Sequence, residues 1–425
     1  MTGIRAYFGP RPLASFALGV SSGFPLTLLL STMTYWLAKV GIDKKTIGFA
    51  IGLTTPYTLK FLWAPLIDKL RLPGLTRLFG QRRAWLFFVQ ALLVAAIWHL
   101  GASDPAQHLG RFAFWALATA FLSATQDIII DAYRIEILPG PELPYGTAMN
   151  QFGYRFGNLL AGAGTVWLAS GEGFGGGWAK AYAMTALLVL PATIAALLIG
   201  PGMHDAVVRR VRERGWFRST VIAPFREFLS RRGALLILLF VLIYKLGDAM
   251  GQSMLNPMIV DLHFTDKEYI AVSKFIGFGS LMAGIALSAP LISRLGMGRA
   301  LFATGVLMML TNLLFSLLAV IGHSTVMLAL AVGTENFLSG LALTAFATYL
   351  SGLSNLAYTA TQYALLSSFA AVGRTFLAAP AGIAAEAFGW PLFYVFTTLV
   401  ALPGLIVLWI MWQRGFVGEA VRTAT

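Results

Sequence analysis

The 425-residue sequence has no cysteine and few charged residues. Without cysteine, structural disulfides and thiolate metal sites are excluded. Charged residues make up 12% of the chain, whereas a soluble domain carries about 25%. Hydrophobic residues make up 57%. A chain with this balance cannot cover its own surface with polar groups, so lipid must surround much of it.

Signals for catalysis and for bound cofactors are also missing. The sequence has no G-x-S-x-G, no H-E-x-x-H and no nucleotide-binding signature. None of its five histidines lies three or four residues from another ligand type in an expected helix. We therefore expect no enzyme, no metal site and no organic cofactor. Without a motor domain, any pumping must draw on an ion gradient such as that of protons.

Long apolar runs fill most of the chain. A membrane-crossing helix needs roughly 20 mainly apolar residues, and we find about twelve such runs. They lie near residues 12-37, 44-66, 83-102, 111-138, 146-170, 179-200, 233-258, 268-292, 299-320, 324-351, 357-386 and 389-413. Barrel strands would instead alternate over about ten residues. The predicted fold class is all-α, a polytopic membrane protein with the lipid bilayer as its main surroundings.

The placement of the basic residues predicts the orientation in the membrane. A net charge of +13 would favour nucleic acid as the partner of a soluble protein. Here arginine gathers instead in alternate connections, above all in 201-232, and after the last span. The loop with Lys39, Lys44 and Lys45 is an exception. Lysine and arginine stay on the cytoplasmic side, so both termini should be cytoplasmic, and no nucleic acid is expected.

Two halves of the sequence echo each other. The run Ala64-Pro65-Leu66-Ile67 recurs at 289–292, and Asp43-Lys44 recurs as Asp266-Lys267, in the same order. Such a repeat predicts the major facilitator plan, in which two six-span bundles are related by an axis along the membrane normal. We expect bundles at 1-200 and 233-425, joined by a basic cytoplasmic linker at 201-232.

The turn after the second span carries an acid and a basic cluster. Asp68, Arg82 and Arg83 can bridge neighbouring helices in one state and release them in another, which makes them candidate gating residues. The alternative is a plain positive-inside loop. The second copy of the repeat has Ser293 in place of Asp68, so any such gate is asymmetric.

Several charged residues fall inside the apolar runs. A charge at the bilayer centre costs about 2.5–3.5 kcal/mol on insertion scales, so it faces a partner or water and is a candidate for function. These residues are Lys60, Asp127, Asp131, Arg155, Lys245, Asp248, Glu335 and Arg374. Asp127 and Asp131 share a helix face. Two such carboxylates disfavour double ionisation, which suits proton exchange. The alternative is a set of buried ion pairs that only fix helix register.

Several strings resemble the AmpG permeases. Those in the N-terminal half are Ser22-Gly23-Phe24-Pro25-Leu26, the run 60–66 (KFLWAPL), Ser123-Ala124-Thr125-Gln126-Asp127-Ile128 with Asp131, and Gly153-Tyr154-Arg155. Those in the C-terminal half are the run 244–249 (YKLGDA) and the run 359–365 (TATQYAL). The outer loops and the basic linker match less clearly.

The resemblance implies import of anhydro-muropeptides together with protons, for peptidoglycan recycling, across a bacterial inner membrane. The substrate is a sugar with peptide carboxylates, and the carrier is expected to be a monomer. Proton coupling is expected at Asp127 first, then at Asp131 and Asp248. Glu335 and Arg374 are assigned to gating. The expected substrate-binding residues are Tyr57, Lys60, Gln126, Gln151, Tyr154, Arg155, Asn158, Tyr244, Lys245, Gln362 and Tyr363.

The expected mechanism is rocking of residues 1-200 against 233-425 about a midplane cavity. Rival interpretations stay open: a carrier of another polar anion, a drug exporter or an acyl-coenzyme A transporter of the same fold. A drug exporter should have apolar, aromatic cavity walls, whereas the mixed charge here favours an ionised substrate. A membrane enzyme or sensor would need a catalytic pair, a metal site or a soluble output domain, and the linker 201-232 is too short to form such a domain.

Overall fold

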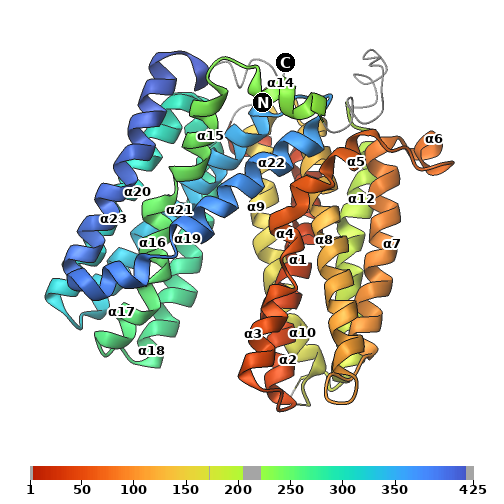
Figure 1. Cartoon of the computed structure of the whole chain (residues 1–425), viewed down its shortest axis with the longest axis horizontal. Helices are drawn as coiled ribbons and strands as arrows, with labels where there is room; N and C mark the ends of the chain where they lie inside the picture. Colours follow the sequence, from red (N-terminus) through yellow and green to blue (C-terminus); the bar gives the residue numbers. More distant parts are fainter. Residues whose placement is uncertain (1–2, 172, 204–221, 418–425) are drawn as a thin grey trace. The chain divides into compact units, whose positions relative to one another are not determined.

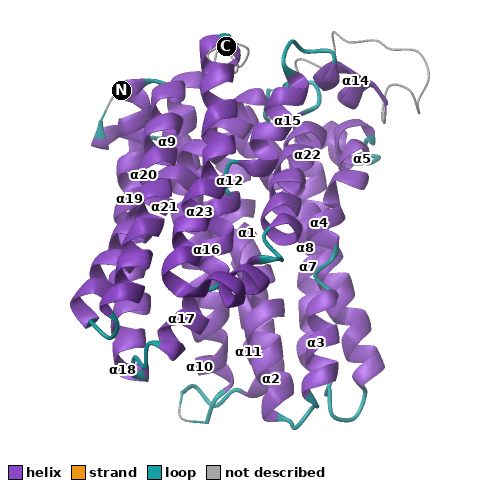
Figure 2. Cartoon of the chain, turned by 60° about the vertical axis from the view of Figure 1, so that its left-hand side comes forward, coloured by secondary structure: helices purple, strands orange, loops and turns teal. Residues whose placement is uncertain are grey.

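A computed structural model describes residues 3–171, 173–203 and 222–417, and these form helices joined by short loops, without a strand (Figure 2). They form two compact units. The first holds the described residues of Gly3–Phe225 together with Ser354–Ser368, and the second those of Arg226–Leu353 and Phe369–Thr425. The all-α prediction is confirmed. The proposed bundle boundaries stay a prediction, and the arginines of the linker between 209 and 218 lie outside the described residues.

Most of the expected spans are present as long apolar helices. In the described residues, nine helical stretches are long and apolar enough to cross a membrane. They are Pro10–Lys39, Gln81–Ala102, Leu109–Ile137, Gly177–Ile199, Ala234–Asp261, Asp266–Leu295, Met297–Ile321, Thr325–Leu353 and Ala381–Gln413.

The three other expected spans are helical but interrupted or rich in polar residues. The second consists of α3 (Lys44–Gly52), α4 (Pro56–Leu59), the 3-10 turn η3 (Lys60–Leu62) and α5 (Ala64–Lys69). The fifth consists of α9 (Leu143–Leu159), the π turn η5 (Leu160–Gly164) and α10 (Thr165–Ala169). The eleventh consists of α22 (Thr359–Val372) and the π turn η9 (Gly373–Leu377). It ends at Leu377 rather than at 386. The next helix, α23 (Ala381–Gln413), begins sooner and kinks at Gly389, whose φ is 70°.

In the first unit, α1 (Pro10–Thr27) packs against α8 (Leu109–Ile137), α9 and α12 (Leu190–Ile199). Figure 1 shows α7, α8 and α12 running side by side. The remaining elements are η1 (Ile4–Phe8), η2 (Leu28–Thr32), α2 (Met33–Lys39), α6 (Leu75–Phe79), α7 (Gln81–Ala102), η4 (Gly140–Glu142), α11 (Gly177–Ala186) and η6 (Leu187–Val189). Pro25 lies inside α1 and removes one backbone donor just before the π turn η2.

Glycines set the distance between α1 and α9. A Cβ on Gly153 would come within 2.0 Å of the Phe16 carbonyl oxygen, and one on Gly157 within 2.3 Å of the Val20 carbonyl oxygen. On α1, Gly19 and Gly23 face the α9 backbone just as closely. Small residues at such positions allow membrane helices to approach backbone to backbone. This contact holds the fifth span, and hence Arg155, against the first.

In the second unit, α21 (Thr325–Leu353) packs against α19 (Gly277–Leu295) and α20 (Met297–Ile321). Helix α23 packs against α20, α15 (Ala234–Ile243) and α16 (Leu246–Ser253). The seventh span is thus broken between α15 and α16, at Tyr244 and Lys245. The remaining elements are α17 (Leu255–Asp261), α18 (Asp266–Tyr269) and the π turn η8 (Ile270–Ile276). The short helix α14 (Ala223–Leu229) lies at the boundary of the two units in the sequence.

We predict that Gly153→Ala lowers the melting temperature of the detergent-purified protein, because its Cβ would push the two backbones apart. Overpacking of a close contact destabilises a protein by about 1–3 kcal/mol. Gly164→Ala is the matched control, since a Cβ there meets nothing within 4 Å. Equal melting temperatures of the two variants would contradict close packing at Gly153.

Candidate functional site

A buried ion pair lies in the middle of the first unit. The ammonium of Lys60 is 2.9 Å from Asp127 Oδ2 and 3.9 Å from Asp131 Oδ2. The Ser22 hydroxyl donates to the second oxygen of Asp127. Lys60 is at the start of the 3-10 turn η3, where the second span is broken. The sequence predicted the two carboxylates on one face of α8, and the structure brings a single lysine to both.

Arg134 completes this group, although sequence reasoning missed it. Its guanidinium lies 3.5 Å from Asp131 Oδ1 and donates to the Thr147 hydroxyl at 3.0 Å. It also lies over the ring of Tyr363, 5.6 Å from the ring centre. The available signal was its spacing, one helical turn after Asp131. Asp131 therefore lies between two cations, Lys60 and Arg134, whereas Asp127 pairs with Lys60.

The polar residues expected to bind substrate in the first unit have different surroundings. The Tyr57 hydroxyl is 2.7 Å from Ser123 Oγ, and Tyr154 and Asp127 both lie near it. The Gln126 amide donates to the Ser21 carbonyl at 2.7 Å and is fully buried. With its amide turned so that oxygen and nitrogen exchange places, Asn158 donates to the Gly23 carbonyl at 2.7 Å.

These contacts separate packing residues from accessible ones. Gln126 and Asn158 hold helices together. Gln151 is half-buried on α9 and makes no side-chain hydrogen bond within the described part of the chain. Tyr57, Tyr154 and Gln151 remain placed for contact with a ligand.

Arg155 differs from the other charged residues of the first unit. It lies near the middle of the helical stretch 143–169 and is half-buried. Its Nε is buried without a hydrogen-bond partner. Its guanidinium contacts the ring of Tyr154, 5.9 Å away. Within residues 3–171, 173–203 and 222–417 no carboxylate pairs with it. A membrane-embedded cation in this position needs water or an anion beside it.

Asp68 and Arg82 form a second buried charge cluster in the first unit. The Arg82 guanidinium donates to Asp68 Oδ1 at 2.5 Å and to Glu136 Oε1 at 2.7 Å. All three side chains are almost completely buried. The sequence predicted Asp68 and Arg82 but missed Glu136, which follows on α8. Arg83, also predicted for gating, donates to the Phe79 carbonyl instead.

The carboxylate of Asp68 also binds the first turn of α22. The backbone N–H groups of Ala360 and Thr361 donate to it at 3.2 and 2.8 Å, and the Thr361 hydroxyl donates at 2.5 Å. An anion at a helix N-terminus satisfies free amides and is attracted by the helix dipole. Asp68 therefore ties the second span to the start of the eleventh.

The same segment fixes two further predicted residues. The side-chain oxygen of Gln362 accepts from the Asn355 amide at 2.8 Å, and its nitrogen donates to the Pro224 carbonyl at 3.1 Å. Gln362 thus holds backbone in this structure. Tyr363 is buried beneath Arg134 and lies near the carboxylate of Asp131.

The second unit has its own charged cluster at the break in the seventh span. Lys245 occupies the N-cap of α16, and Asp248 lies in the first turn of the same helix. A cation is unfavourable at a helix N-terminus, and an acid in the first turn offsets it. Arg374 of η9 and Glu335 of α21 lie near Asp248. Sequence reasoning assigned the last two to gating, and the structure groups them with Lys245 and Asp248.

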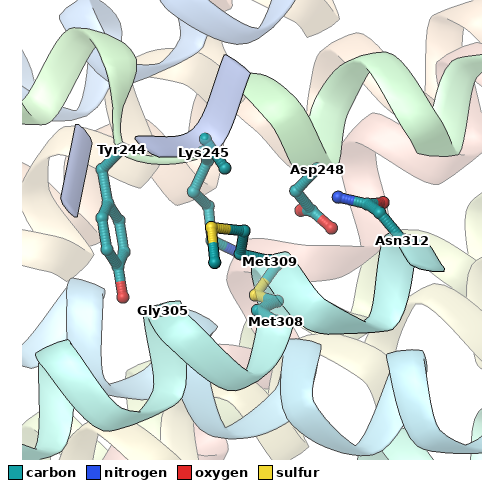
Figure 3. Close-up of a pocket in the computed structure, with 8 residues that line it drawn as sticks. Tyr244, Lys245, Asp248, Gly305, Met308, Met309 and Asn312 are labelled. Atoms are coloured by element: carbon teal, nitrogen blue, oxygen red, sulfur yellow. The ribbon is translucent and has the colours of Figure 1, made fainter. Parts of the chain in front are cut away.

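A small cavity lies beside this cluster, as Figure 3 shows. Its volume is about 10 Å³, and its walls include Tyr244, Lys245, Asp248, Met308 and Asn312. The Tyr244 hydroxyl donates to the Leu301 carbonyl at 2.9 Å, and its ring stacks on Phe346. The cavity is just large enough for one water molecule.

An open groove lies near the ends of α2 and α10 in the first unit. It has a volume of about 600 Å³, and its walls include Ser31, Tyr35, Gly162, Trp167 and Ser170. Both neighbouring helices have a π turn at this level, η2 and η5. Such turns are frequent at functional sites. Tyr35 and Trp167 are about half-exposed, at 47% and 58%.

The charged clusters do not form a metal site. Among the described residues, no group of three or more His, Asp or Glu side chains is arranged to hold a metal ion. The clusters instead combine acidic and basic side chains, such as Lys60 with Asp127 and Arg82 with Asp68.

Comparison with known proteins identifies the class. The sequence profile of the Major Facilitator Superfamily matches residues 15–378. The structure also resembles that of FucP, a Major Facilitator Superfamily transporter in the outward conformation, with a TM-score of 0.67 and 15% identity over 96% of this chain and 99% of that one. The protein is a multi-pass inner-membrane transporter of the major facilitator fold, not an enzyme.

Curated relatives define the family more narrowly. The chain is 37% identical over 406 residues to the anhydromuropeptide permease of Escherichia coli K12, covering 95% of this chain and 80% of that one. It is 34% identical to the putative transporter AmpG 4 of Rickettsia conorii, covering 92% and 94%. The chain belongs to the AmpG family of permeases.

The Lys60–Asp127 pair gives a prediction for stability. Removing one partner of a buried pair destabilises a protein by about 3–5 kcal/mol, because the other charge is left behind. We expect Lys60→Met and Asp127→Asn each to lower the melting temperature, and the double variant to recover much of the loss. Additive losses in the double-mutant cycle would contradict a direct pair.

The Asp68 cap gives a prediction for backbone protection. We expect Asp68→Asn to speed hydrogen–deuterium exchange in 359–363 about tenfold or more, since a hydrogen bond to a charged group contributes about 1.5–3 kcal/mol. Asp43→Asn is the control, because Asp43 caps a different helix through the Thr46 amide. Unchanged exchange at 359–363 in Asp68→Asn would contradict the cap.

Proposed function

We propose that the protein imports anhydro-muropeptides from the periplasm to the cytoplasm together with protons, for peptidoglycan recycling. The proton gradient supplies the driving force, and no cofactor is required. We place both termini in the cytoplasm, because arginine gathers in alternate connections of the sequence and after the last span. The carrier works as a monomer within the bilayer. The relationship to an anhydromuropeptide permease supports the choice of substrate class.

The observation that carries the proposal is the guanidinium of Arg155. It lies mid-span and has no carboxylate partner in the described residues. The peptide of a muropeptide has carboxylates, which an arginine binds through two parallel hydrogen bonds. A drug exporter with an apolar cavity would have no use for such a cation. Tyr57, Tyr154 and Gln151 lie on the same unit and are placed for the sugar and amide groups.

The open groove suits the sugar part of the ligand. Tyr35 and Trp167 are half-exposed aromatic side chains in its wall, and Ser31 adds a hydroxyl. Ligand sites of this kind combine aromatic walls with a few polar groups that fix orientation. We propose that this groove receives the sugar rings while Arg155 holds a carboxylate.

The cap on α22 supports a gating role for Asp68 and Arg82. In this structure the carboxylate holds three donors at the start of α22 and is itself held by Arg82. Separation of Asp68 from α22 would leave those amides without their acceptor. Such a contact has two discrete states, held or released, as alternating access requires.

The test is uptake of labelled anhydro-muropeptide into proteoliposomes with an inward proton gradient. We expect Arg155→Gln to raise KM about tenfold or more, because a charge-assisted hydrogen bond contributes about 1.5–3 kcal/mol. Arg155→Lys keeps the charge but loses the bidentate geometry, so it should fall between Arg155→Gln and wild type.

A modified ligand separates charge recognition from folding. With the peptide carboxyl groups converted to amides, wild type should lose affinity, and Arg155→Gln should no longer distinguish the two ligands. If Arg155→Gln discriminates as well as wild type, Arg155 does not bind the carboxylate. If well-folded wild type takes up neither ligand, the substrate assignment is wrong and another polar anion is the cargo.

A further inference from the structure

The two aspartates of α8 differ in how closely their oxygens are held. Asp127 Oδ2 accepts from the Lys60 ammonium at 2.9 Å, and its Oδ1 accepts from the Ser22 hydroxyl. Both are donors, so they favour the ionised carboxylate. The two cations beside Asp131 are farther away: Lys60 lies 3.9 Å from its Oδ2, and Arg134 lies 3.5 Å from its Oδ1. A charge-assisted hydrogen bond from such a cation measures about 2.7–2.9 Å, so Asp131 is the more loosely held of the two.

Of the two cations, Lys60 is the one that can move. The Arg134 guanidinium donates to the Thr147 hydroxyl at 3.0 Å and lies over the ring of Tyr363, so α9 and α22 both hold it in place. Lys60 is at the start of the turn η3, where the second span is broken. Its ammonium is a compact charge on a flexible stem of four carbons. Because it lies between the two aspartates, a small shift would transfer it from Asp127 to Asp131.

The other titratable side chains around the two aspartates are tyrosines. The Tyr57 hydroxyl bonds Ser123, one turn before Asp127 on α8, and Tyr154 of α9 lies near Tyr57. Tyr363 of α22 lies beneath Arg134. Tyrosine is neutral near pH 7. The charge of this site is therefore set by its two aspartates and its two cations.

With both aspartates ionised, the charges of the site cancel. A proton on Asp131 leaves one positive charge in excess, and Lys60 then pairs with Asp127 alone. An unbalanced charge in a buried site is unfavourable, and an anionic group of the substrate would balance it. Arg155, proposed above to receive a carboxylate, belongs to the same unit. Proton and anion thus favour each other's binding, which is the coupling that a symporter requires.

We infer that Asp131 carries the coupled proton, and that Lys60 moves from Asp127 toward Asp131 when the proton leaves. The inference rests on the proposed function and deepens it. The proton comes from water on the periplasmic side, forms an O–H bond at one oxygen of Asp131, and returns to water on the cytoplasmic side. The side chain of Asp131 is 19% exposed, against 1% for Arg134, so the protein does not seal it off. Asp127, which the sequence favours as the proton carrier, instead holds Lys60 while Asp131 is protonated.

The experiment compares two transport modes in proteoliposomes. Accumulation driven by a proton gradient requires proton binding and release, whereas exchange of labelled for unlabelled muropeptide does not. We expect Asp131→Asn to lose about tenfold or more in accumulation, the scale of a coupling free energy, and to keep exchange within about threefold of wild type. Asp131→Glu keeps a titratable group and should recover part of the accumulation. Glu142→Gln is the matched control and should accumulate like wild type, since Glu142 pairs with Arg11 at the surface of the same unit.

The pH profile of Asp127→Asn separates the two aspartates. Lys60 should then pair with Asp131 and favour its ionised form, so accumulation should persist but require a more acidic external medium. If Asp127→Asn instead loses accumulation and keeps exchange, the proton is on Asp127. If Asp131→Asn still accumulates substrate, Asp131 does not carry the proton.

Infrared spectroscopy of the purified protein gives a readout that needs no substrate. We expect a band of a protonated carboxyl that declines as the pH is raised, disappears in Asp131→Asn, persists in Asp127→Asn and moves in frequency in Asp131→Glu. An unchanged band in Asp131→Asn and Asp131→Glu contradicts the inference, even if proton-driven uptake of muropeptide is found. Failure of wild type to take up muropeptide, with the band behaving as expected, would refute the substrate and leave the proton site standing.

Discussion

Every charge buried in a membrane helix must meet an opposite charge, a hydrogen-bond partner or water, and this constraint organises the molecule. Lys60 joins Asp127 and Asp131, and Arg82 joins Asp68 and Glu136. Lys245 and Arg374 lie near Asp248. Replacing such groups with well-packed apolar residues is often neutral or stabilising. Their presence therefore points to a task that apolar residues cannot perform.

The clusters differ in how completely their charges are matched, and the differences separate their roles. The Asp68–Arg82–Glu136 cluster is buried and closed by backbone amides of α22, which suits a contact that holds one state. The guanidinium of Arg155 has no carboxylate partner in the described residues, which suits a role in binding an anionic ligand. The second copy of the repeat has Ser293 at the position of Asp68, so this helix cap has no acidic equivalent there. The gate, the substrate site and the proton site can then lie in different parts of a pseudo-symmetric fold.

Much of the fold could be predicted from the sequence because the bilayer imposes length and apolarity on each helix. The repeat at 64–67 and 289–292 predicted the second and eighth spans as equivalent. The charged residues were found because they interrupt apolar runs. Asp68 was placed in a gate by its basic neighbours, but its acceptor role toward Ala360 and Thr361 depends on a segment far away in the sequence.

What could not be predicted depends on tertiary contact. Arg134 and Glu136 lie near the expected end of the fourth span, so their burial gave no signal in the sequence. Gln362 resembled a substrate ligand, yet both ends of its amide bind backbone. Asp248 and Glu335 come from different spans, and no spacing rule places them near each other. The breaks in the second span at Lys60 and in the seventh span at Lys245 likewise become visible only in the structure.

The most direct measurement is of the proton movement that muropeptide itself drives. Proteoliposomes with no imposed pH difference would receive anhydro-muropeptide outside, while a pH-sensitive dye reports the medium. Symport predicts that the medium becomes more alkaline as substrate enters, and that a protonophore abolishes the change. Substrate entry without any change in pH would contradict proton-coupled transport.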